Sequence, residues 1–387
     1  MSSLRPTLRI ALALALCACG GHSPATPAEK EAGPALAAST SPAPQPVLAA
    51  IPTPPPSPTP PPAPPEPITK APDPTPGPLT PLTAEQRTLL RAGPEDPLTP
   101  TPIHYMKSNE VRHDVWFPYI AGKGGALLGV GSDQNYTLAA VARSEFLFLA
   151  DIDQSVADLH RNYEVLIEAS PDPASLVEKF SASATESSIA LLTSAYADLP
   201  EPERRRLIRL YRNARETVRI HVERVIKRKQ DGEPTTWLSD AALYDHIRAM
   251  FQADRVRPMA GNLIGPNSLQ SAAAAAKALG TTIRVVYFSN AEEYFMYVPQ
   301  FVANVEALPV DDGTVVLRTI YSKEWVHADQ LWAYQVQPMS DYKARLARRV
   351  SGRNSLLVKV AADGTLNKET GTKGLSLISM PVAPASK

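Results

Sequence analysis

The stretch 125–153, GALLGVGSDQNYTLAAVARSEFLFLADID, sets the fold of this chain. Its apolar run Ala126–Val130 predicts a buried strand, and a helix is expected from about Asp133 to Arg143. A second apolar run, Phe146–Ala150, predicts another strand. Strand, glycine turn, helix and strand in this order are typical of the opening unit of an α/β domain with a parallel sheet.

The remaining chain repeats this alternation of strands and helices. Further strands are expected at Val256–Ala260, Ile283–Phe288 and Thr314–Ile320, with Leu331–Val336 as an antiparallel neighbour. Helices are expected at Gln154–Ala169, Pro202–Lys229, from Ser239, at Ser268–Leu279, Ala291–Val305 and Asp341–Val350, with a hairpin around Asp363-Gly364. The predicted fold is therefore α/β: a mostly parallel Rossmann-like sheet with helices on both faces, a helical insertion at about 171–252, and a terminal β-hairpin.

The first 19 residues predict export and a lipid anchor. Arg5 and Arg9 precede the apolar run Ile10–Leu16, which is too short to span a bilayer. The end of this segment, Leu16-Cys17-Ala18-Cys19-Gly20, resembles the lipobox of bacterial lipoproteins. That resemblance implies cleavage before Cys19 and its acylation with a lipid such as palmitate, which would hold the protein to the cell envelope at the outer membrane. An ordinary cleaved signal peptide is the alternative.

Composition divides the rest of the chain. Of its 40 prolines, 26 lie between residues 22 and 102, which predicts a disordered linker at 20–102. A folded domain is expected at 103–340, followed by an extension and a loose tail at 341–387. Both cysteines lie in the first 19 residues, so the folded part has no disulfide, cysteine metal ligand or cysteine nucleophile. The formal net charge of zero gives no strong nucleic-acid signal.

The segments that follow the predicted strands resemble the motifs of class I S-adenosylmethionine-dependent methyltransferases. More narrowly, GVGSDQNY and YFSNAEEY look like a group of uncharacterised bacterial proteins with a methyltransferase-like fold, over about 103–340. The resemblance implies cofactor contacts from the turn Gly129-Val130-Gly131, a ribose contact from Asp151 or Asp153, an adenine contact from Gly261-Asn262, and a substrate side at Ser289-Asn290-Ala291-Glu292.

The turn departs from the family pattern at Asp133. A methyltransferase turn has a third glycine there, and the nicotinamide pattern G-x-G-x-x-G has one at Gln134. A carboxylate at the start of a helix would repel the anionic groups that helix N-termini attract, and would favour an ammonium, a metal ion or a hydroxyl. An exported domain also has no evident supply of S-adenosylmethionine. No cofactor is therefore assigned, and S-adenosylmethionine is the one that the resemblance implies.

Each candidate residue also has a structural explanation. Ser132 and Asp133 are favoured helix caps, and Asp151 and Asp153 could end a strand, hold a ribose, or bind a hard cation together with Asp133. Asn262 could simply make a turn.

Ser289 and Glu292 fit an S-x-x-E capping box. The histidines lack metal-binding spacing, so no metal site is predicted. His160 is expected to be packed or solvated, and the arginine-rich face of the helix Pro202–Lys229 is expected to face solvent, with binding to an anionic polymer or lipid as the alternative.

Two functions follow from these observations. The first is a binding or envelope-associated module, with an unidentified ligand or protein partner, on a fold whose cofactor turn is degenerate. The alternative is an S-adenosylmethionine-dependent methyltransferase with an atypical first motif.

Overall fold

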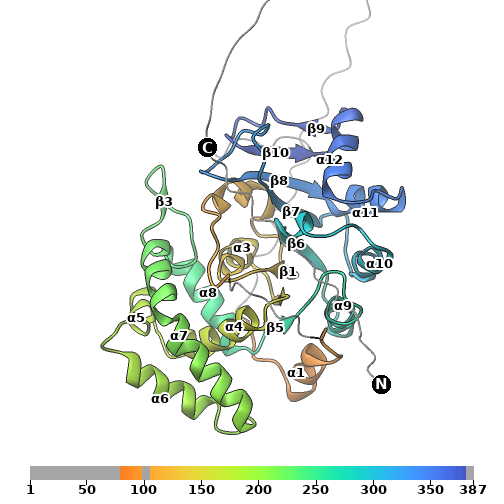
Figure 1. The fold of residues 1–387 in the computed structure, drawn as a ribbon. Helices are drawn as coiled ribbons and strands as arrows, with labels where there is room; N and C mark the ends of the chain where they lie inside the picture. The colour runs from red at the N-terminus through yellow and green to blue at the C-terminus, as the bar shows by residue number, and fades with distance from the viewer. Residues whose placement is uncertain (1–78, 98–104, 381–387) are drawn as a thin grey trace, which may run out of the picture. The chain divides into compact units, whose positions relative to one another are not determined.

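The computed structural model describes residues 79–97 and 105–380, which build an α/β domain around an eight-stranded sheet (Figure 1). The strand order is β5-β2-β1-β6-β7-β8-β10-β9. The five parallel strands are β5 (Val256–Ala260), β2 (Phe146–Asp151), β1 (Ala126–Val130), β6 (Ile283–Ser289) and β7 (Val315–Ile320). Strand β8 (Ala333–Pro338) runs antiparallel to β7. The predicted fold class is confirmed, and five of the six predicted strands agree within one residue at each end.

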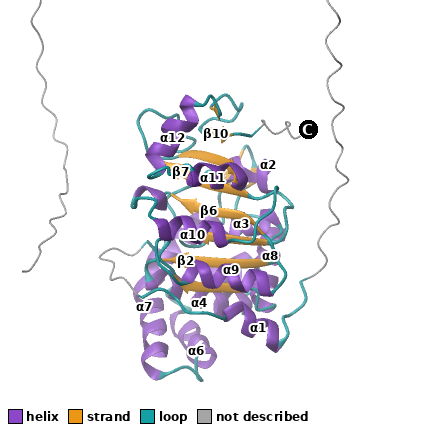
Figure 2. Ribbon diagram, turned by 90° about the vertical axis from the view of Figure 1, so that its right-hand side faces the viewer, coloured by secondary structure: helices purple, strands orange, loops and turns teal. Residues whose placement is uncertain are grey.

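Helices cover both faces of the sheet (Figure 2). One face carries α2 (Phe117–Ile120), α3 (Gln134–Ala142), α4 (Gln154–Glu168) and α8 (Ala241–Gln252), with the insertion α5 (Pro173–Glu178), α6 (Thr185–Ala195) and α7 (Glu201–Val225) outside them. The other face carries α1 (Ala84–Arg91), α9 (Ser268–Ala278), α10 (Pro299–Ala307), α11 (Met339–Ala347) and α12 (Arg353–Ala362). None of the helices in 79–97 and 105–380 is long and apolar enough to cross a membrane.

Strand alternation divides the core into two clusters. Leu127 and Leu147 pack into the cluster on the α3 side, and Leu128 and Phe148 pack into the one on the α9 side. Because both faces are covered, the central strands are continuously apolar, as is typical of parallel sheets. This pattern made the strands predictable from sequence.

The insertion packs on α4 through the inner face of α7. The apolar residues of this face are all buried: Leu207, Tyr211, Ala214, Val218 and Val225. On the outer face, Arg219 pairs with Glu216 at 2.6 Å and with Glu223 at 2.5 Å. After α7, a short ribbon forms from β3 (Lys229–Gln230) and β4 (Glu233–Pro234).

The next helix, α8, starts later than predicted. Its cap is Asp240, whose carboxylate accepts from Ala242 N at 2.8 Å and Leu243 N at 3.2 Å. The predicted start at Ser239 is therefore wrong: the cap lies one residue later, and the helix begins at Ala241.

The predicted helix Ala291–Val305 is wrong. A 3-10 turn, η2 (Ala291–Glu293), precedes a loop, and α10 begins only at Pro299. Ser289 has a φ of 51° and makes no capping bond, so the predicted capping box is also wrong.

Glu292 instead turns into the core. There it pairs with the buried Arg318 at 2.7 Å and accepts hydrogen bonds from Tyr342, at 2.7 Å, and Tyr297.

Residues 341–380, expected to be an extension and a tail, belong to the domain. Helices α11 and α12 bury Tyr342, Leu346 and Leu356 in the α9-side cluster. Strand β10 (Leu375–Ile378) pairs with β8, and β9 (Leu366–Asn367) pairs with β10. Gly364 follows the end of α12, so the predicted hairpin around it is wrong.

Residues 79–97, expected within the linker, lie along the open edge of β5. Arg257 donates to the carbonyls of Leu90, at 2.9 Å, and Ala92, at 2.8 Å. The Glu95 carboxylate accepts from Ala260 N at 2.9 Å. Pro258 has no N–H, so its nitrogen faces away from β2. The edge strand is therefore covered on its outer side.

We expect Glu292→Ala to lower the free energy of unfolding by about 3–5 kcal/mol, because it leaves the Arg318 guanidinium buried without its counter-ion. Urea denaturation measures this change. Glu306→Ala on α10 is the control, because Glu306 makes only a surface pair with Lys343 at 3.6 Å and should cost less than about 1 kcal/mol. Equal losses for the two variants would contradict the assignment.

Candidate functional site

The strand order reverses between β1 and β6, and ligands of open α/β sheets bind at the carboxyl ends of the strands beside such a reversal. At this point lie the turn after β1, with Gly131 at a φ of 86°, and the end of β6 at Ser289. The candidate site is therefore taken to be this edge of the sheet.

The glycine turn is filled by side chains of the helix that follows it. The Gln134 amide lies over Gly131, and the Asn135 amide lies against Gly129, each within the space that a Cβ on that glycine would need. Asn135 Nδ2 donates to the carbonyls of Val130, at 2.9 Å, and Ser132, at 3.0 Å. A Cβ at either glycine would collide with one of these amides, so side chains of α3 fill the space beside the turn.

His160 fixes the same turn from α4. Its Nε2 lies 2.9 Å from the Gly131 carbonyl oxygen, and its Nδ1 lies 2.6 Å from the Tyr136 hydroxyl. Burial lowers the His160 pKa to about 4, so the ring is neutral near pH 7. The expectation that His160 is a packed residue is in agreement with these contacts.

Asp133 turns away from the start of α3 and toward the insertion. Its Oδ1 lies 2.7 Å from His221 Nε2 on α7, and its Oδ2 accepts from Trp237 Nε1 at 3.1 Å. Asp133 occupies the N-cap position of α3, as predicted, but its side chain makes no capping bond to the helix. Burial alone would raise the Asp133 pKa, but the charge and hydrogen bond of His221 outweigh it and lower the pKa to about 2. Since its charge is already compensated, the expectation that Asp133 selects a cationic ligand loses its basis.

The two acids after β2 have separate roles. Asp153 caps α4 by accepting from Ser155 N at 2.9 Å. Asp151 Oδ1 accepts from Asp153 N at 2.9 Å, and burial raises the Asp151 pKa to about 6. The described residues contain no group of three or more His, Cys, Asp or Glu side chains placed to hold a metal ion.

The remaining predicted site residues lie apart from one another. Asn262 Oδ1 accepts from Ile264 N at 3.1 Å, which makes a local turn after β5. Asn290 Nδ2 donates to the exposed Tyr294 hydroxyl at 3.2 Å. Ser289 donates to Glu110 at 2.5 Å, and Glu292 is buried on the other face of the sheet. The structure therefore brings Gly129, Gly131, Asp133 and Asp151 together around one turn, and joins Ser289 to this region only through Glu110.

Glu110 is a central residue that the sequence did not reveal. Its carboxylate accepts from Tyr287 at 2.6 Å, Ser289 at 2.5 Å and Thr319 at 2.7 Å, and lies 3.2 Å from His113 Nε2. Burial opposes ionisation of Glu110, but the His113 and hydroxyl hydrogen bonds lower its pKa. No motif marks these residues, because the partners come from distant segments.

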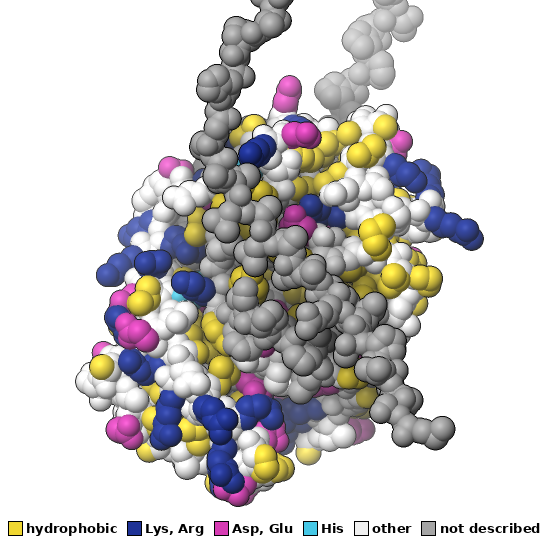
Figure 3. Space-filling view, viewed as in Figure 1, with side chains coloured by type: hydrophobic (Ala, Val, Ile, Leu, Met, Phe, Trp, Pro, Cys, Tyr) yellow, Lys and Arg dark blue, Asp and Glu magenta, His cyan; other side chains and the backbone are white. Residues whose placement is uncertain are grey.

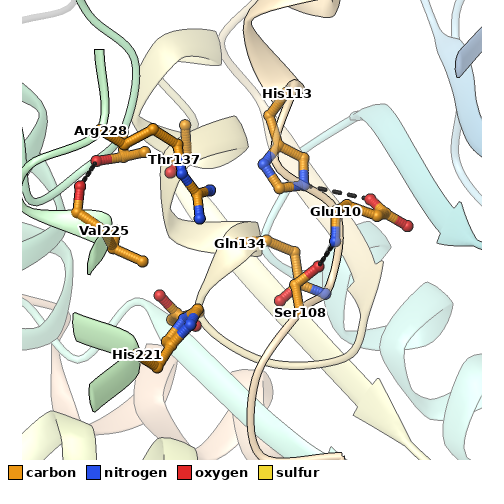
Figure 4. A pocket seen from close by; sticks show the side chains of 10 residues that line it. Ser108, Glu110, His113, Gln134, Thr137, His221, Val225 and Arg228 are labelled. Carbon is orange, nitrogen blue, oxygen red and sulfur yellow. Dashed lines mark hydrogen bonds and ion pairs between the residues drawn. The ribbon is translucent and has the colours of Figure 1, made fainter. Parts of the chain in front are cut away.

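A small cavity of about 10 Å³ separates the two histidine–carboxylate pairs (Figure 4). Its walls include Glu110 and His113 on one side and His221 and Arg228 on the other, with Gln134 between them. Asp133, which pairs with His221, also lines the cavity. The histidines are scattered in the sequence without metal-binding spacing, and no sequence pattern connects His113, His221 or Arg228 with the site.

The fold and this site define an α/β domain with a mostly parallel sheet, in which side chains fill the space beside the glycine turn. The chain belongs to the family described as "Domain of unknown function (DUF7790)", whose model matches residues 105–379. No curated protein matches the chain.

Among solved structures, the chain is similar to an rRNA methyltransferase, aviRa, from Streptomyces viridochromogenes. The structure at 1.5 Å shares 11% identity over 62% of this chain and 83% of that one, with a TM-score of 0.27. The structure at 2.4 Å shares 13% identity over the same fractions, with a TM-score of 0.26.

We expect Asp133→Asn to lower the free energy of unfolding near pH 6 by about 2–3 kcal/mol, because it removes the charge that pairs with His221. The folded-state pKa of Asp133, about 2, lies below the ordinary 3.8. Its ionisation therefore stabilises the fold above pH 4, and this stabilisation is lost as the pH falls from 4 to 2. Urea denaturation across this range should show the difference between the variant and the native chain shrinking.

Asp151→Asn is the matched control, because ionisation of Asp151 changes the free energy of unfolding in the opposite direction. Its folded-state pKa, about 6, is raised, so its ionisation destabilises the fold as the pH rises from about 4 through 6. The Asp151→Asn variant should be as stable as the native chain, or more stable, at pH 7.5. A pH-independent loss in Asp133→Asn would contradict the role given to its charge.

Proposed function

We propose that this chain is an exported, lipid-anchored protein whose domain binds a ligand or protein partner at the cell envelope and does not use S-adenosylmethionine. The observation that carries this proposal is the glycine turn. The amides of Gln134 and Asn135 fill the space directly beside Gly131 and Gly129. A cofactor that contacts the backbone of this turn would meet these side chains.

A cofactor at such a turn needs close contact with the backbone and with the free N–H groups at the helix start. Here His160 holds the turn in its filled form, because its Nε2 lies 2.9 Å from the Gly131 carbonyl oxygen. Clearing the turn would also break the two bonds from Asn135 to the carbonyls of Val130 and Ser132. The residues present therefore do not fit the cofactor that the fold family implies.

One feature favours the alternative, an S-adenosylmethionine-dependent methyltransferase. Asp151 ends β2, which is where that family holds the ribose hydroxyls, and its side chain accepts from the backbone of Asp153 and Gly131. It would keep acceptor capacity for a hydroxyl. Binding of S-adenosylmethionine in the calorimetric titration described below would support this alternative.

The anchor and the linker support placement at the envelope. The lipobox-like segment ending at Cys19 and the proline-rich residues up to 78 lie outside the described residues. An extended proline-rich tether rises about 3.1 Å per residue, so it would lift the domain well clear of a membrane surface. We propose acylated Cys19 in the outer membrane as the attachment.

Calorimetric titration of the full chain with S-adenosylmethionine, S-adenosylhomocysteine and NAD tests the first part of the proposal. We expect no saturable heat with any of the three ligands in the micromolar range. The matched variant is Asp151→Ala, which removes the side chain that would hold a ribose. Saturable micromolar binding by the native chain that disappears in Asp151→Ala would establish the methyltransferase alternative.

Metabolic labelling with a palmitate analogue, followed by membrane fractionation, tests the anchor. The native chain should incorporate label and remain with membranes, and Cys19→Ser should lose both properties. Cys17→Ser is the control and should behave as the native chain does, because Cys17 follows Leu16 and not a small residue. A Cys19→Ser chain that still carries label would refute the anchor.

A further inference from the structure

Arg228 is the one charged group at the cavity whose side chain has no bonded partner. It follows α7, and its backbone N donates to the Val225 carbonyl at 3.1 Å. Figure 4 shows its guanidinium pointing into the space between His113, Gln134 and His221. Across residues 79–97 and 105–380 this guanidinium makes no hydrogen bond or ion pair.

The two carboxylates that line the cavity are bonded to residues other than Arg228. Glu110 is surrounded by three hydroxyl donors and His113. Asp133 is held by His221 and Trp237. The oxygen atoms of both carboxylates are bonded to these neighbours, and neither carboxylate bonds the Arg228 guanidinium.

A partly buried guanidinium without a partner is unfavourable. It carries five N–H donors and no acceptor, and desolvation without a counter-ion costs free energy. Burial lowers the pKa of Arg228, and the nearby charge of Asp133 only partly offsets this effect. An oxyanion would supply both the charge and the acceptors.

Other donors face the same space. The Ser108 oxygen accepts from Glu110 N at 3.0 Å, which leaves its hydroxyl hydrogen free to donate. His113 uses Nε2 toward Glu110, and its other ring nitrogen has no bond within the described part of the chain. The cavity, about 10 Å³, has room for one water-sized group, so only the end of a larger ligand can enter.

We propose that this cavity receives the oxyanion end of a ligand, a carboxylate or a phosphate, and that Arg228 is the residue that anchors it. The planar guanidinium matches the paired oxygens of either group. This inference rests on the proposed function, in which the domain is a binding module, and it names the chemistry that such a ligand presents.

Titration of the full chain with sodium phosphate and, separately, with sodium acetate tests the anchor, with chloride at matched ionic strength as the reference. Calorimetry should show saturable binding in the millimolar range for at least one of the two ions. Preference for phosphate indicates a phosphorylated ligand, and preference for acetate indicates a carboxylate ligand.

Arg228→Gln should weaken that binding at least tenfold. Arg228→Lys should fall between Arg228→Gln and the native chain, because an ammonium keeps the charge and loses the paired donors. Arg224→Gln on α7 is the matched control, because Arg224 is exposed and does not line the cavity, and it should bind as the native chain does. Urea denaturation of each variant establishes that it is folded.

Two results would overturn the proposal. The first is that neither ion saturates the chain up to about 50 mM, a concentration well above the expected millimolar Kd. The second is equal affinity in the native chain and in a folded Arg228→Gln variant. Either result leaves the binding module intact as a proposal, since a partner could contact another surface. Conversely, micromolar binding of S-adenosylmethionine would remove the proposed function without affecting the phosphate and acetate titrations.

Discussion

The pairing of Asp133 with His221 and Trp237 is the interaction on which this arrangement depends. It joins the turn after β1 to two positions about ninety and one hundred residues later, at distances of 2.7 and 3.1 Å. Trp237 also packs edge-on against Tyr136, with ring centroids 5.0 Å apart, and stacks on Tyr244 at 5.9 Å. Asp133 thus connects the turn after β1 to the helical insertion.

A second buried carboxylate, that of Glu110, is also held by donors from distant segments. Glu110 precedes the first strand in sequence, yet it receives hydroxyl groups from β6 and β7 at the ends of those strands. Both acids exchange water for several protein donors, which is the condition under which a buried charge is tolerated. Arg228 lacks such partners, and this contrast is what distinguishes it from the other charged groups nearby.

The sequence predicted the sheet well because the strands are short apolar runs buried on both faces, such as Phe146–Ala150, and periodicity detects them directly. It failed where tertiary contacts override local preference. Glu292 fits a capping box by spacing, but the buried Arg318 on β7 draws it into the core. Asp133 has the composition of a helix cap, but its partners lie in the insertion. Glu110 and Arg228 carry no local pattern at all, since their surroundings form only when distant segments meet.

The cover over β5 has a consequence for contacts between copies of this domain. An unprotected strand edge presents unpaired N–H and C=O groups, which can pair with the edge of another copy. Pro258 removes one outward donor, and Glu95 occupies the N–H of Ala260. Glu95 lies before residues 105–379, which the family model matches. Residues 79–97 thus protect the edge of the sheet from self-association, and a shortened chain beginning after residue 97 would be prone to aggregate.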